Sequence, residues 1–122
     1  MIEKEFIPYE LALKLKQLGF NEPCFGFYDE NLYFPNNESI YGTFCNQILD
    51  SSSCSAPTYS QAFRWFREKY ELSSWIYNSN LDKYFYTILM NGRIVKANEQ
   101  STTYEEAELE CLKKLIEITK NK

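Results

Sequence analysis

Few side chains in this sequence could carry out catalysis, because the chain contains no histidine. Histidine is the commonest general base and the commonest metal ligand. The run 51–55 offers serine hydroxyls and the Cys54 thiol, yet such nucleophiles need an adjacent base. Glycine motifs that cradle phosphates are absent too, since the chain has only 4 glycines. These residue types predict a protein that is not an enzyme and that holds neither a metal nor a cofactor.

Aromatic and cationic side chains could instead recognise a ligand or a partner. Trp65 falls outside the apolar stripe of a helix predicted over 58–71, and Arg64 and Arg67 lie opposite that stripe. A tryptophan placed there can anchor an interface or stack on a nucleobase, or it can pack beneath the 35–56 loop. The candidate binding residues are therefore Trp65, Arg64, Arg67 and Arg93, whose guanidinium groups could pair with phosphate. The residues assigned to the stripe itself are Tyr59, Ala62, Phe63, Phe66 and Tyr70.

The cysteines stand at positions 24, 45, 54 and 111, with no CxxC pair. An even number permits two disulfides in a secreted protein, whereas a cytosolic chain keeps its thiols reduced. We expect four free structural thiols.

Charge and hydropathy limit where the protein acts and what it binds. The net charge is −4, and no cluster of lysine and arginine offers the footprint that nucleic acids require. No signal peptide opens the sequence, and no apolar run approaches the ~20 residues needed to span a bilayer. We therefore expect a cytoplasmic protein that binds neither nucleic acid nor membrane.

Three helices and up to six strands are predicted to position these residues. Each of the later two helices begins with a capping box, in which two side chains satisfy backbone N–H groups at the helix start. The predicted helices span 8–18, 58–71 and 103–120, and the boxes pair Thr58 with Gln61 and Thr103 with Glu106. Asn91-Gly92 predicts a type I′ hairpin turn. Strands are expected at 24–28, 32–34, 40–44, 74–77, 84–90 and 93–96.

The element order predicts an α+β fold: one compact domain in which three helices pack on mostly antiparallel, aromatic-rich strands. The serine-rich stretch 50–56 is interpreted as the connection between two possible halves, 1–56 and 57–122. The order is helix, two or three strands, helix, three strands, helix.

The last helix is apolar over a wide arc, which indicates burial on two sides. Leu109 and Ile116 share the second side, seven residues apart. Either another part of the chain covers them, or they form an interface in a homodimer.

Several blocks of the chain resemble a family of small uncharacterised proteins encoded by bacteriophages and by prophage or mobile regions of bacterial genomes. The blocks are 8–20 (PYELALKLKQLGF), 22–26 (EPCFG), 57–70 (PTYSQAFRWFREKY) and 104–109 (YEEAEL). The resemblance implies a phage context and supplies no activity or site residues.

Two functions remain open at this point. The first is a non-enzymatic phage accessory protein that binds a host or phage protein, because tyrosine and tryptophan are favoured in interfaces. The second is a binder of a small ligand, such as a counter-defence protein that sequesters a host signalling nucleotide. An aromatic pocket with convergent arginines or lysines would favour the ligand, and a flat apolar patch would favour the protein.

Overall fold

The computed structural model describes residues 5–22, 24, 26–29, 31–33, 53–80 and 83–121. These residues form three helices and two three-stranded antiparallel sheets, which confirms the predicted α+β class. The predicted strand at 40–44 lies outside the described residues. The chain divides into two compact units, Met1–Gln61 and Ala62–Lys122, and each is described by itself.

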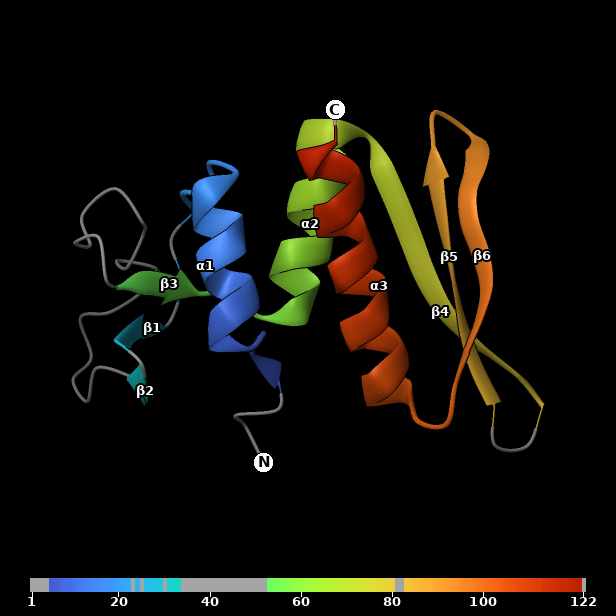
Figure 1. Cartoon of the computed structure of the whole chain (residues 1–122), viewed down its shortest axis with the longest axis horizontal. Coiled ribbons are helices and arrows are strands. Elements are labelled where there is room, and N and C mark those ends of the chain that lie inside the picture. The colour runs from blue at the N-terminus through green and yellow to red at the C-terminus, as the bar shows by residue number, and fades with distance from the viewer. Residues whose placement is uncertain are drawn as a thin grey trace. The chain divides into compact units, whose positions relative to one another are not determined.

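The first unit contains one helix and one small sheet with strand order β2-β1-β3 (Figure 1). Helix α1 contacts β3, and its buried side chains Leu11, Ala12 and Leu15 belong to the core of this unit. The elements are α1 (Tyr9–Gln17), β1 (Gly26–Asp29), β2 (Asn31–Tyr33) and β3 (Cys54–Ala56).

Helix α1 ends where the sequence predicts. Gly19 adopts φ +102°, a left-handed conformation that side chains disfavour. The N–H of Phe20 donates to the carbonyl of Leu15 at 3.0 Å, and that of Gly19 donates to Lys16 at 3.0 Å. This pair of bonds is a Schellman motif, which satisfies carbonyls at the helix end. Phe20 and Leu15 are both fully buried, so the motif also links two residues of the core.

Strand β3 occupies the last three residues of the stretch 50–56, which the sequence analysis interprets as a connection. Cys54–Ala56 is a buried strand that pairs antiparallel with β1, with Gly26 opposite Ala56 and Tyr28 opposite Cys54. Its residues are small and have little β-propensity, so their sequence carries no strand signal. The strand exists because β1 and α1 supply its partners, which only the tertiary fold provides.

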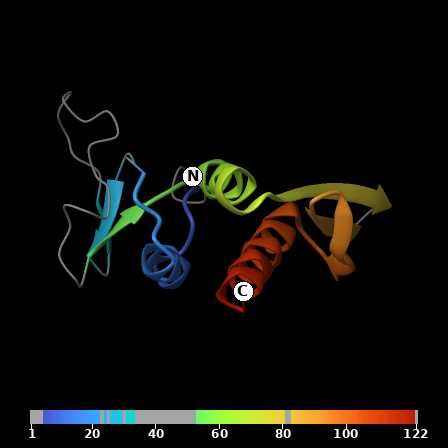
Figure 2. The ribbon, with the colours of Figure 1, turned by 90° about the horizontal axis from the view of Figure 1, so that it is seen from above.

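The second unit is a sequential antiparallel sheet, β4-β5-β6, with α3 packed along one face (Figures 1 and 2). Helix α2 leads into it and ends before Glu71, whose φ of +58° interrupts helical geometry. The elements are α2 (Tyr59–Tyr70), β4 (Leu72–Asn80), β5 (Lys83–Met90), β6 (Arg93–Ser101) and α3 (Tyr104–Lys120). The three predicted strands of this unit are confirmed and extend further than expected.

The β5–β6 hairpin confirms the predicted turn. Asn91 and Gly92 have φ of +54° and +82°, as a type I′ turn requires at both central positions. Met90 pairs with Arg93 directly beside the turn.

Side chains alternate between the two faces of this sheet. The inner face meets α3: Tyr84 contacts the ring of Tyr104, and Ser74 hydrogen-bonds with Cys111. Fully buried residues on this side include Leu72, Ile88, Ala107, Cys111 and Leu115.

In the described parts of the chain, no helix combines the length and the apolar character needed to cross a bilayer.

Candidate functional site

Trp65, the predicted aromatic anchor, is buried. Only 5% of its surface is exposed, and its ring packs edge-on against Phe66 at 5.1 Å and Tyr70 at 5.4 Å between centroids. The buried residues of α2 are Ala62, Trp65 and Phe66, so the core face includes a residue that the helical wheel placed outside it. Trp65 therefore presents no open ring face for a nucleobase in this conformation.

The three candidate arginines are all exposed. Arg64 and Arg67 lie three residues apart and share the solvent-facing side of α2. Arg93 lies on β6 next to the hairpin turn. It pairs with Met90 of β5, and Met90 pairs with Leu72 at the start of β4, so β5 separates Arg93 from Leu72. Neighbouring strands are about 4.8 Å apart, which puts Arg93 about 10 Å from the start of β4.

The two candidate interface residues of α3 differ in exposure. Ile116 is only 3% exposed in a single copy of the chain, so it is already covered without a partner, and Leu109 is half-buried. These two residues do not form the exposed apolar strip that a dimer interface on this helix would need.

The three cysteines that the structure describes, Cys24, Cys54 and Cys111, are free and buried. Burial raises the pKa of Cys54 to about 11, although the nearby Lys16 ammonium opposes the shift. Burial also raises the pKa of Cys111 to about 12. Both thiols are protonated at neutral pH, and a protonated thiol is a poor nucleophile and a poor metal ligand.

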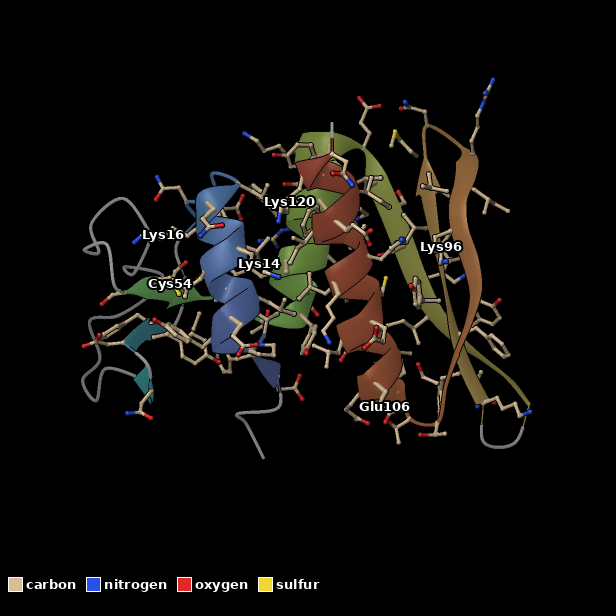
Figure 3. All side chains as sticks on the ribbon, viewed as in Figure 1. Lys14, Lys16, Cys54, Lys96, Glu106 and Lys120 are labelled. Carbon is tan, nitrogen blue, oxygen red and sulfur yellow. The ribbon has the colours of Figure 1, made fainter. Side chains whose placement is uncertain are left out.

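Among the described residues, no three aspartate, glutamate, cysteine or histidine side chains cluster in a way that could hold a metal ion. Figure 3 shows how the charged side chains distribute over the described elements, including Lys14 and Lys16 on α1 and Glu106 on α3.

A different surface collects exposed aromatic and aliphatic side chains: the face of the β4-β5-β6 sheet that points away from α3. We call it the outer face and define it by Trp75, Tyr77, Phe85, Thr87, Leu89 and Ile94. The register pairs Trp75 with Thr87, Tyr77 with Phe85 and Leu89 with Ile94. Trp75 is 47% exposed and Ile94 67% exposed.

The outer face is organised by cross-strand contacts. The rings of Tyr77 and Phe85 stack with centroids 5.6 Å apart and an angle of 23° between their planes. Aromatic cross-strand pairs of this kind stabilise a sheet and hold each other in one rotamer. Thr87 is buried and lies at the base of the outer face.

A shallow, open hollow of about 470 Å³ lies on this face, lined by Trp75, Tyr77, Thr87, Leu89, Gly92 and Ile94. None of these described lining residues is charged. Arg93 is adjacent to two of them in sequence, but side chains alternate along a strand, so it projects to the side opposite Ile94. The hollow offers aromatic and aliphatic contact area without a cation to bind phosphate.

The outer face was not identified from the sequence, although its signal is present. Trp75 and Tyr77 alternate with Ser74 and Ile76 in period two, as expected of a strand with two distinct faces. An antiparallel sheet commonly buries one face and exposes the other. Which set faces α3 depends on the tertiary packing, so the sequence alone does not separate the exposed aromatic set from the core set.

Comparisons of the chain with family models, with curated proteins and with solved structures found no match.

Proposed function

We propose that this protein is a non-enzymatic protein-binding module that docks its partner on the outer face of the β4-β5-β6 sheet. The observation that carries the proposal is the exposure of Trp75 and Ile94 beside the stacked pair of Tyr77 and Phe85. Exposed apolar clusters on soluble domains mark interaction sites, and tryptophan and tyrosine are the most frequent energetic anchors of protein interfaces.

The shape and chemistry of the surface support a protein partner over a nucleotide. Small-molecule sites are concave and place a few polar groups around the ligand. The hollow is open and shallow, and its described lining carries no charge. Trp65 is buried, so it does not extend the surface with a stacking platform near Arg64 and Arg67.

The resemblance to phage-encoded proteins suggests the source of the partner. We propose a phage-type accessory role in the host cytoplasm, with a host or phage protein presenting an apolar patch to the outer face. Shape complementarity and a central aromatic anchor would then supply most of the affinity.

The direct test is capture of a partner from lysate of phage-infected cells, followed by calorimetry with the purified partner. The Trp75→Ser/Ile94→Ser variant removes two exposed apolar anchors and should weaken binding about tenfold or more. Tyr104→Ser is the matched control, because Tyr104 is 45% exposed in the same unit but lies outside the outer face. Its affinity should stay at the wild-type level.

Two results contradict the proposal: a wild type that retains no host or phage protein, or a double variant that binds as tightly as the wild type. Thermal-shift screening against nucleotides checks the other function. A nucleotide at a hundred times its dissociation constant would stabilise the protein by about 2.7 kcal/mol.

A further inference from the structure

Strand β4 forms an edge of the β4-β5-β6 sheet. It pairs with β5 on one side, and no other described strand pairs with it. Alternate backbone N–H and C=O groups along its outer side therefore have no strand partner among the described residues. Such an edge is a template on which another strand can add. In Figure 2, β4 runs along this side of the sheet.

The other edge, β6, carries features that discourage pairing. Its sequence includes Arg93, Lys96 and Glu99, and its register with β5 shifts twice. Charged residues and bulges are the usual means by which proteins protect an edge strand. The protein thus protects one edge of this sheet with charges and irregularity.

Strand β4 lacks these protections. Its sequence, LSSWIYNSN, contains no charged residue and no proline. Its register with β5 is continuous from Leu72 to Asn78, and the irregularity follows only at Asn78/Asn80. A long, uncharged edge strand with a continuous register is a surface on which another strand can pair.

We propose that β4 pairs antiparallel with β4 of a second copy of this chain, around a two-fold axis at Ile76. In this register Trp75 lies opposite the partner's Tyr77, and Ser74 lies opposite the partner's Asn78. Both of these pairs match in polarity, and every pair stays on one face of the joint sheet. The aromatic pair repeats on both sides of the axis and adds cross-strand contacts on the outer face.

The composition of β4 favours a second copy as its occupant. The chain carries a net charge of −4, so two copies carry net charge of the same sign. The uncharged β4 edge brings no like charges opposite one another. A two-fold axis places β4 of one copy beside β4 of the other. Because β4 is complementary to itself in this register, the two strands can form an isologous interface, in which both copies use the same surface. The product is one continuous six-stranded sheet whose outer face is doubled.

This proposal rests on the strand edge and not on the proposed function. A monomeric protein that still binds a partner through the outer face would overturn the dimer alone.

The test is sedimentation velocity of the purified full chain from micromolar to hundred-micromolar concentrations. The wild type should form a dimer. Trp75→Lys/Tyr77→Lys places like charges opposite each other at both symmetry-related pairs, and should weaken dimerisation at least about tenfold. Trp75→Lys/Tyr77→Glu places opposite charges in the same positions and should restore the dimer. Circular dichroism verifies that each variant is folded.

Ile94→Lys is the matched control, because it adds a lysine to the same outer face on the other edge strand. It should leave the dimer intact, whereas a dimer formed by stacking two outer faces would dissociate. Hydrogen exchange of the wild type gives a reading that needs no variant: protection of the β4 amides should rise with protein concentration. A monomeric wild type, a charge-paired variant that stays monomeric, or β4 protection independent of concentration would each overturn the proposal.

Discussion

The start of α3 shows how individual hydrogen bonds define a helix terminus. The hydroxyl Oγ1 of Thr103 accepts from the N–H of Glu106 at 3.1 Å. The Glu106 carboxylate accepts from the N–H and the hydroxyl of Thr102, at 3.1 and 2.9 Å. The predicted capping box is therefore present with one change. The Glu106 carboxylate accepts from Thr102, whereas a capping box predicts a bond from the N–H of the N-cap residue, Thr103. The two hydrogen bonds from Thr102 lower the pKa of Glu106 below its ordinary value of 4.5.

The lowered pKa of Glu106 predicts how stability depends on pH. A carboxyl group whose pKa is lower in the folded state stabilises the protein above its unfolded pKa, and this contribution is lost as the pH falls through the folded value. We expect Glu106→Gln to have a lower melting temperature than the wild type at neutral pH. The difference should shrink as the pH falls below about 4.5. Calorimetric melts of both proteins across acidic pH measure it, and a difference that persists unchanged at pH ~3 would contradict it.

At the scale of elements, the β5–β6 hairpin depends on the backbone conformation of its turn. Gly92 has φ of +82°, and a Cβ built there meets no atom within 4 Å. Gly92→Ala should therefore destabilise the protein through backbone strain alone, by about 1–2 kcal/mol. Urea denaturation should show a lower midpoint with an unchanged slope.

Asn91→Gly serves as the matched control for the turn. Asn91 also has positive φ, and glycine adopts that conformation without strain, so this variant should unfold close to the wild-type midpoint. A Gly92→Ala variant as stable as the wild type would show that the turn relaxes to another type.

The elements differ in how far the sequence predicts them. Gly19, Thr103 and the Asn91-Gly92 pair act through local backbone chemistry, so the ends of α1, the start of α3 and the hairpin turn follow from the residues themselves. Strand β3 is formed by tertiary pairing, and small residues give no local signal for it.

The candidate site shows the same division between local and tertiary information. Trp65 is only 5% exposed, and the wheel of a single helix does not predict this burial because it leaves out the packing of other elements. The exposed position of Trp75 follows from which face of the sheet α3 covers. Periodicity predicts two faces, and only the packing decides which of them is buried.

At the scale of the whole molecule, buried thiols in both units report on unfolding. Cys24 and Cys54 lie in the first unit and Cys111 in the second, and all are almost completely inaccessible. We expect a thiol reagent to label them slowly in the native protein and rapidly in denaturant, as measured by mass spectrometry of peptides. A Cys45→Ser background restricts the assay to these three cysteines.

The pH dependence of labelling provides a second reading. A thiol whose pKa is raised by folding stabilises the protein fully below its unfolded value of 9.0, and this contribution is lost as the pH rises through the folded pKa of about 11 for Cys54. Native labelling of Cys54 should therefore stay slow at pH 9, where an ordinary thiol is substantially ionised. Labelling at the rate of a free thiol under native conditions would contradict the burial.

The order of strands also has a consequence for how the chain folds. In the β4-β5-β6 sheet every strand pairs with its neighbour in sequence, and α3 follows directly, so each step closes only a short loop. In the first unit Gly26 must find Ala56, 30 positions further along the chain. Since folding slows as contacts become more distant in sequence, we expect the C-terminal half to acquire its structure on the order of milliseconds. We expect the N-terminal sheet to form later, with β3 as the last element to pair.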